Sequence, residues 1–594
     1  MSSITRRNFL SAGTASALAL AASRFTVVEL HAAPKNSKNK NTPEVALDNF
    51  IAAYMRAMNA PGMTLGTASK SGTVRVAAYG FNDPDLKQKI DPAQLFHIGS
   101  ITKSFLSLVL LQLREEGKID FQRPVLEYLP WLPIETPFAP VTTHHLLTHT
   151  SGLPDALVLF PSERTAKWQQ GYKPGEKFYY SNMGFDILGH LVEALDGHSW
   201  PTAVKTRVID RLRMTSTSSN ITNDLRPRTA KSYVPLFDDR PYPRMGKLTP
   251  AGGFQFDDAA GSIASTAHDM TLYAQMLLNR GQGPDGRIIS EESFVLMSKP
   301  YVKAEEFGPT ANYGYGIAVD TLDGHPVLRH TGGMPSFASA ILLDLETGAG
   351  AFASINAMQG YRPTQVVQYA VQLMSAAAAA TKSLPAAPAI DDPMTVANAA
   401  DYVGSYVTSD GKKLDVSGDK QLFAAINGKR VALQHAEGDS FLTDDPEFAR
   451  YLFTFGRTKA PDSEKSDAKE SESKTDAKPT EEKPKPQPVI ELTHGPDWYR
   501  NDRYTGAIDF KPSETYKAFT GYYVASGMFP ASAEILVRKG ELWMEGAFQL
   551  QPIGENEFAP DSGIPERVEF LFVAGGKARL MKFAGEDFWR FERS

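Results

Sequence analysis

The chain has 594 residues, of which 42% are hydrophobic and 22% are charged, and its formal net charge is −6. This composition supplies enough apolar surface for two or three folded domains and excludes a fibrous or wholly disordered protein. The acidic balance provides no field that attracts nucleic acid, so we expect no nucleic-acid partner. The sequence has no cysteine, which excludes disulfide bonds, a thiolate nucleophile and a zinc site with cysteine ligands.

The start of the chain has the pattern of an export signal. Arg6 and Arg7 precede a weakly apolar, alanine-rich run over 12–22, which is typical of the twin-arginine route. We therefore predict a removable signal over 1–33 and a soluble product in the periplasm or outside the cell. No later stretch of sequence has the apolar length of a bilayer span, so we expect no membrane span after signal removal. A basic N-terminal helix that stays attached is the alternative.

Residues 43–381 are predicted to form an α+β domain, in which helices flank an antiparallel sheet and a helical lobe lies beside it. Two β-rich runs, 63–68 and 73–79, flank Lys70-Ser71-Gly72 and indicate a hairpin. Apolar residues over 105–113 fill several helical faces, which predicts a helix buried nearly all round. Further helices are predicted over 184–195, 270–278 and 364–380, and further strands over 327–330, 338–345 and 350–355.

A linker with three prolines is predicted over 382–396, and a β-rich region follows over 397–594. This region repeats itself, because Tyr402 to Tyr406 matches Phe519 to Tyr523 and a second motif recurs at an offset of 90 residues. Two similar halves of short strands predict an antiparallel β-barrel, since closure of a sheet hides its edges.

The first half of this β-rich region is longer than the second by 27 residues. A run of Lys, Glu, Ser, Asp and Pro over 460–487 accounts for the surplus, and it has too little apolar surface to offset its own ordering entropy. We expect a disordered insertion that replaces a hairpin turn, where added length costs little closure entropy. A solvated tether is the preferred role, and a binding role is the alternative.

Ser100 and Lys103 form a Ser-x-x-Lys motif where the predicted buried helix begins. A spacing of three residues places both side chains on one helical face, so the Lys103 ammonium can reach the Ser100 hydroxyl. The helix N-terminus adds a positive potential that favours an alkoxide, and it supplies a free backbone N–H. Other Ser-x-x-Lys matches lie in polar sequence or near turns of the barrel region, so Ser100 is the candidate nucleophile.

Two further motifs offer groups for the same reaction. Tyr180-Ser181-Asn182 precedes a predicted helix, and a tyrosine beside a lysine can act as a base because the ammonium stabilises the phenolate. His330-Thr331-Gly332-Gly333 ends a predicted strand, where glycines let a substrate lie along the edge and let N–H groups point at an oxyanion. Each motif alone also fits a structural role, as a buried tyrosine or as a histidine before a glycine turn.

The three motifs occur together, with first residues at positions 100, 180 and 330. In this order they resemble the class C β-lactamase and penicillin-binding-protein group across about residues 44–380. Leu146 to Leu153 and Ala260 to Ser262 also look like phrases of that group. The resemblance implies a β-lactamase/transpeptidase-like α+β domain, followed here by a barrel that is similar to the lipocalin-like domain of some related hydrolases.

The resemblance also implies a role for each matching position. Ser100 would be acylated, while Lys103 and Tyr180 would share its proton. Asn182 would bind the substrate amide or the lysine. His330, Thr331 and Gly332 would line the substrate, and the backbone N–H groups of Ser100 and Gly333 would form the oxyanion hole.

The chain departs from the antibiotic-resistance pattern at His330, where many β-lactamases have lysine. A lysine attracts a substrate carboxylate, whereas a histidine is mostly neutral at pH 7. We therefore predict an esterase or a D-amino-acid-type amidase or peptidase, which acts without a cofactor on small-molecule esters, amides or short peptides. A β-lactamase, a D-alanyl-D-alanine carboxypeptidase and a penicillin-binding sensor without turnover are the alternatives.

Three neighbouring histidines raise the question of a metal site. His145 and His149 stand at helical spacing with His144 beside them, but position 146 is leucine rather than the glutamate of a zinc-protease helix. We therefore predict no metal site.

The barrel region is predicted to shield the catalytic mouth and to mediate a homo-oligomer, and binding of a small apolar ligand is the alternative.

Overall fold

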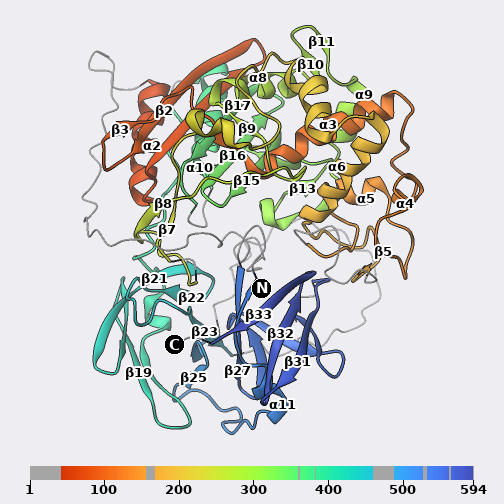
Figure 1. The fold of residues 1–594 in the computed structure, drawn as a ribbon. Helices are drawn as coiled ribbons and strands as arrows, with labels where there is room; N and C mark the ends of the chain where they lie inside the picture. The colour runs from red at the N-terminus through yellow and green to blue at the C-terminus, as the bar shows by residue number, and fades with distance from the viewer. Residues whose placement is uncertain are drawn as a thin grey trace, which may run out of the picture.

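The computed structural model describes residues 42–155, 167–237, 239–358, 362–381, 383–458, 487–525, 531–560 and 564–592. The predicted export signal at 1–33 lies outside these residues, as does the charged insertion at 460–487 except for its last residue. Figure 1 shows a larger body of helices around a sheet, with two β-barrels below it.

The larger body is built on one antiparallel sheet of nine strands. These are β1 (Gly62–Ser69), β2 (Gly72–Asp83), β3 (Gln88–Lys89), β12 (Val302–Lys303), β13 (Asn312–Tyr313), β14 (Ala318–Leu322), β15 (His325–Met334), β16 (Phe337–Asp344) and β17 (Ala349–Ile355). Their spatial order is β12-β13-β14-β15-β16-β17-β1-β2-β3. The N-terminal hairpin therefore pairs with the C-terminal strands.

Helices cover both faces of this sheet (Figure 1). On one face, α2 (Pro43–Ala57) packs with α10 (Thr364–Ala378), and both helices contribute to a core of their own. On the other face, α8 (Ala267–Leu278) packs against β1, β2 and β17. Two more helices, α3 (Thr102–Glu115) and α6 (Asn182–Asp196), extend this second core into the helical lobe. Every residue of α3 from Thr102 to Leu113 is buried, which confirms the predicted all-round burial of this helix.

Shorter elements complete the larger body. They are β4 (Phe96–His97), η1 (Gly99–Ile101), α4 (Val125–Tyr128), β5 (Ile134–Glu135), α5 (Thr143–Leu147), β6 (Trp168–Gln169), α7 (Trp200–Val204), η2 (Lys205–Ile209), η3 (Asn223–Arg228), β7 (Tyr233–Pro235), β8 (Leu248–Pro250), β9 (Ala264–Ser265), β10 (Gln282–Gly283), β11 (Gly286–Arg287), α9 (Glu291–Met297) and η4 (Glu305–Phe307).

Strand β15 is longer than the sequence predicted. The predicted strand covers 327–330, but the ladder with β16 continues to Met334, and Gly332 lies opposite Ser339. A Cβ atom at Gly332 would collide with the carbonyl oxygen of Ile98. The glycine therefore lets the end of β15 approach the backbone that precedes Ser100, rather than ending the strand in a turn.

The C-terminal β-rich region forms two closed barrels, because the strands of each copy of the repeated sequence close into a barrel of their own. The first barrel comprises η5 (Ala399–Asp401), β18 (Gly404–Val407), β19 (Lys413–Ser417), β20 (Leu422–Ile426), β21 (Lys429–Glu437), β22 (Ser440–Leu442), β23 (Phe453–Arg457), β24 (Val489–His494) and β25 (Asp497–Arg500). The second comprises α11 (Glu514–Phe519), β26 (Gly521–Ala525), β27 (Ala531–Arg538), β28 (Glu541–Met544), β29 (Phe548–Pro552), β30 (Glu557–Pro560), β31 (Val568–Ala574), β32 (Lys577–Phe583) and β33 (Glu586–Phe591).

Each barrel has eight strands and its own apolar core. The predicted insertion falls between β23 and β24, which pair as neighbours in the first barrel. Within the described ranges, no helix combines the length and the apolar character that a bilayer crossing requires.

Candidate active site

Ser100 lies in η1, directly before α3, and its side chain is nearly buried. Gly99 before it has a φ of 57°, a conformation that favours glycine. A Cβ at Gly99 would lie 2.6 Å from the backbone nitrogen of Gly333. The turn that carries Ser100 therefore packs directly on the end of β15. The backbone at Ser100 and the backbone at Gly333 consequently lie side by side.

Lys103 is the group that links the first two sequence motifs. Its side chain is fully buried, and its ammonium donates to Ser100 Oγ at 3.3 Å, to Asn182 Oδ1 at 2.8 Å and to the Ala260 carbonyl oxygen at 2.7 Å. Three acceptors match the three N–H donors of an ammonium, which makes burial of the charge tolerable. The fixed cation is therefore held against the Ser100 hydroxyl.

Tyr180 packs against the same ammonium. Lys103 Nζ lies 4.9 Å from the centroid of the Tyr180 ring, within the range of a cation–π contact. The phenol ring also stacks on the His149 ring, with centroids 4.2 Å apart. The phenol ring therefore contacts both the cation and an imidazole.

His149 also holds the backbone on both sides of Tyr180. Its carbonyl oxygen accepts from Tyr179 N–H at 2.8 Å, and its Nδ1 accepts from Ser181 N–H at 3.0 Å. The sequence phrase over 146–153 resembles the family, and these contacts give its histidine a physical role that sequence reasoning did not assign.

Asn182 begins helix α6, whose N-cap is Ser181. Its backbone N–H donates to Asp155 Oδ1 at 2.7 Å, and its side-chain Nδ2 donates to Asp155 Oδ2 at 3.5 Å. With the amide N–H₂ directed at Asp155, the Oδ1 atom faces Lys103. Sequence reasoning missed both Asp155 and the Ala260 carbonyl, although Ala260 lies in a phrase that resembles the family.

His330 is buried among aromatic side chains beside the Ser100–Lys103–Tyr180 group, and it does not lie on an open edge of the sheet. The ring is 1% exposed; its Nε2 lies 2.8 Å from the Tyr313 hydroxyl and its Nδ1 lies 2.7 Å from the Thr331 carbonyl oxygen. A carbonyl only accepts, so Nδ1 carries a proton and donates to Thr331; in the neutral form of the ring, Nε2 accepts from the Tyr313 hydroxyl. Thr331 and Gly333 are half-buried, and Gly332 is buried.

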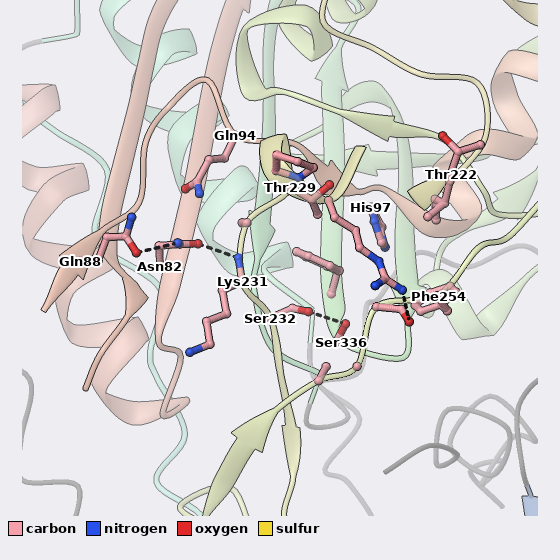
Figure 2. Close-up of a pocket in the computed structure, with 18 residues that line it drawn as sticks. Asn82, Gln88, Gln94, His97, Thr222, Thr229, Lys231, Ser232, Phe254 and Ser336 are labelled. Carbon is pink, nitrogen blue, oxygen red and sulfur yellow. Dashed lines mark hydrogen bonds between the residues drawn. The ribbon is translucent and has the colours of Figure 1, made fainter. Parts of the chain in front are cut away.

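A cavity of about 400 Å³ opens beside His97, three residues before Ser100. Figure 2 shows His97 among the residues that line it, with Phe254 and the Ser232–Ser336 hydrogen bond nearby. Burial lowers the pKa of His97 to about 3, so the ring is neutral at pH 7. Its Nδ1 has no hydrogen-bond partner among the described residues, and none of the lining side chains is a carboxylate.

The three histidines considered as metal ligands each make structural hydrogen bonds. His145 Nδ1 accepts from Thr142 N–H at 3.1 Å, and His144 Nδ1 lies 3.0 Å from the Tyr315 hydroxyl. His149 Nδ1 accepts from Ser181, as above. Among the residues that the structure describes, no group of three or more His, Cys, Asp or Glu side chains is arranged to hold a metal ion.

Known proteins are similar to this chain in sequence. The chain is 24% identical over 356 residues to Protein flp of Staphylococcus aureus (strain NCTC 8325 / PS 47), a match that covers 56% of this chain and 67% of that protein. It is 28% identical over 256 residues to Penicillin-binding protein 4 of Amycolatopsis lactamdurans, with 40% of this chain and 66% of that protein covered.

A solved structure is similar to this chain in its fold. The octameric penicillin-binding protein homologue from Pyrococcus abyssi superposes with a TM-score of 0.51 at 24% identity, and the match covers 70% of this chain and 96% of that one. The family model described as Beta-lactamase matches residues 47–374. This span is more than half of the chain and contains the whole Ser100–Lys103–Tyr180–Asn182 group, and the chain therefore belongs to the β-lactamase family.

Proposed function

We propose that the protein is an exported serine hydrolase that cleaves ester or amide bonds through an acyl-enzyme on Ser100. The contact that carries this proposal is the hydrogen bond of 3.3 Å from the buried Lys103 ammonium to Ser100 Oγ. A cation held against a hydroxyl at the start of a helix lowers the cost of forming the alkoxide. The neighbouring Tyr180 supplies a second group, its phenolic hydroxyl, through which the proton can pass.

The reaction has two stages. In acylation, Ser100 Oγ attacks the substrate carbonyl carbon, its proton passes to the pair formed by Lys103 and Tyr180, and the leaving group departs with that proton. The N–H groups of Ser100 and Gly333 stabilise the oxyanion, and the packing of Gly99 on Gly333 supports their convergence. In deacylation, water attacks the ester, with Tyr180 as its base, and returns Ser100 to the free hydroxyl.

The substrates we propose are small-molecule esters, amides or short peptides without a carboxylate next to the scissile bond. His330 supports this choice, because both of its ring nitrogens are engaged within the protein and the neutral ring provides no charge for a carboxylate. Asn182 would bind the substrate amide in addition to Lys103. No cofactor enters the scheme.

A penicillin-reactive protein is the second candidate function, either as a β-lactamase, as a D-alanyl-D-alanine carboxypeptidase or as a sensor that does not turn over. Similarity to Penicillin-binding protein 4 of Amycolatopsis lactamdurans favours it. Rates with a panel of p-nitrophenyl esters, D- and L-amino-acid p-nitroanilides and penicillins separate the two. We expect turnover of esters or D-amino-acid amides to exceed that of penicillins, and a preference for penicillins would overturn the proposal.

Segments outside the active site are the basis for the location and the oligomeric state that we propose. We infer twin-arginine export to the periplasm or the cell exterior from the pattern over 1–33. We also propose that the barrels contribute to a homo-oligomer, and light scattering on the mature chain tests this: a monomeric mass would contradict it. A signal-dependent shift of the protein into the periplasmic fraction tests the export route.

A further inference from the structure

The second barrel places one side chain inside the wall of the candidate active site. Glu566 lies between β30 and β31, yet it is only 1% exposed. Its Oε1 accepts from the backbone N–H of Asp155 at 2.8 Å. Both of its oxygens lie 2.8 Å from the Tyr179 hydroxyl, which donates to them. A residue of the C-terminal barrel thus holds two segments that are 387 and 411 positions away in the chain.

Both of these contacts lead directly to the proposed catalytic groups. Tyr179 is the residue before Tyr180, so its hydroxyl anchors the backbone from which the phenol projects. Asp155 accepts from Asn182 at 2.7 Å through the Asn182 backbone N–H, and Asn182 in turn accepts from Lys103 at 2.8 Å. Hydrogen bonds that are joined through Asp155 and Asn182 therefore connect Glu566 to the ammonium that contacts Ser100.

The packing around Glu566 shows that this contact belongs to a built interface. A Cβ at Gly171 would lie 2.6 Å from Pro565 Cβ, and a Cβ at Gly585 would run into the Trp168 ring. Two glycines, one on each side, thus permit close approach of the barrel to the larger body. Figure 1 shows the second barrel next to the part of that body that carries β5. Packing of this kind fixes the carboxylate in place and excludes water from it.

We propose that Glu566 is a positioning residue for the active site, so that the second barrel is part of the hydrolase machinery; this rests on the proposed function. A carboxylate can accept several hydrogen bonds at once. Glu566 uses this capacity to fix the Asp155 backbone and the Tyr179 side chain together. It thereby holds Asn182 and Tyr180 at the correct distance from Lys103, although it touches none of the reacting atoms.

Glu566→Gln and Glu566→Ala test the proposal, with Glu557→Gln as the matched control because Glu557 is an exposed glutamate of the same barrel. We expect kcat on the best ester to fall about tenfold for the Gln variant and about 100-fold for the Ala variant, with KM changed less than threefold. Glu557→Gln should keep the wild-type kcat. A Tm within a few degrees of the wild-type value shows that the loss is not unfolding.

Tyr179→Phe supplies an independent arm, because it removes one hydroxyl and leaves the carboxylate in place. We expect it to lower kcat, and we expect the Tyr179→Phe/Glu566→Ala double variant to be no slower than Glu566→Ala alone, since the two residues act through one contact. If the Glu566 variants do not fold, Tyr179→Phe decides: a wild-type kcat overturns the proposal. Wild-type kcat in folded Glu566 variants also overturns it. A wild-type enzyme that forms no adduct on Ser100 instead refutes the proposed function.

Discussion

Lys103 and Asn182, which are 79 positions apart in the chain, are joined by a hydrogen bond of 2.8 Å between Nζ and Oδ1. This bond brings the Ser-x-x-Lys motif at the start of α3 together with the Tyr-x-Asn motif at the start of α6. Because Asn182 is itself held by Asp155, the ammonium has a fixed position. The reactivity proposed for Ser100 depends on that position.

Replacement of Lys103 by methionine keeps a long side chain but removes the cation. We expect kcat/KM on esters to fall by about 10³-fold, because the proton of Ser100 loses its acceptor pair. The variant also leaves the Asn182 and Ala260 oxygens without their buried donor, at about 1–3 kcal/mol each. Steady-state kinetics and urea unfolding measure the two effects. Lys118→Met, at an exposed position, is the control, and activity of Lys103→Met within tenfold of wild type would contradict the role.

Tyr180→Phe removes the phenol oxygen and keeps the ring that packs on Lys103 and His149. We expect deacylation to slow by about 10²-fold or more, since Tyr180 is the proposed base for water, and to slow at least as much as acylation. Intact-protein mass spectrometry during turnover should therefore show the acyl-enzyme accumulate. An unchanged steady-state level of acyl-enzyme with unchanged kcat would exclude Tyr180 as the base.

His330→Lys tests the basis of the proposed substrate class. A lysine at this position adds a positive charge beside the end of β15, so kcat/KM for a carboxylate-bearing ester should rise relative to its neutral analogue by roughly tenfold. His325→Lys places a lysine at the opposite end of β15, where Asp344 already raises the pKa of the histidine, and should leave the ratio unchanged. An unaltered ratio in folded His330→Lys would show that this residue does not select against carboxylates.

His97 predicts a pH dependence of stability. Burial lowers the pKa of His97 to about 3, whereas an unfolded histidine titrates near 6.5. Between these values the unfolded state binds more protons, so the contribution of His97 to stability is complete above about pH 6.5 and is lost as the pH falls towards 3. Urea unfolding at pH 7.5 and 5 should show a smaller loss of stability for His97→Phe than for wild type. His268→Phe, at an exposed position, should lose as much as wild type, and an equal loss in all three proteins would refute the assignment.

Much of the fold could be predicted from local patterns. Apolar residues on every face of 105–113 indicate a helix that can only be buried, and α3 has that burial. The strands that form β1, β2, β16 and β17 follow from short runs that are largely apolar and are joined by the turns Lys70-Ser71-Gly72 and Glu346-Thr347-Gly348. The closure of two separate barrels could not be predicted, because the pairing of β18 with β25 and of β26 with β33 joins the ends of each repeat. Short strands specify their neighbours only through such long-range contacts.

Some contacts of the candidate active site could likewise be predicted from the sequence, and others could not. The contact of Lys103 with Ser100 follows from helical spacing, so a sequence motif predicts it. The contribution of Ala260 is a carbonyl oxygen, which every residue has, and no side-chain pattern marks it. Glu566 reaches the site from another domain, 387 positions from Tyr179, and one glutamate in a β-rich segment carries no local signal. The extension of β15 through Gly332 was hidden because glycine in a sequence usually indicates a turn.

The mass of the intact protein after reaction with a fluorophosphonate, in wild type and in Ser100→Ala, tests whether Ser100 is the nucleophile. We expect one adduct per wild-type chain, located on the peptide that contains Ser100, and no adduct on the variant. The variant should also lose turnover by about 10⁶-fold, as other nucleophile deletions do. An adduct on a different residue, or ester hydrolysis by Ser100→Ala at the wild-type rate, would show that Ser100 is not the nucleophile.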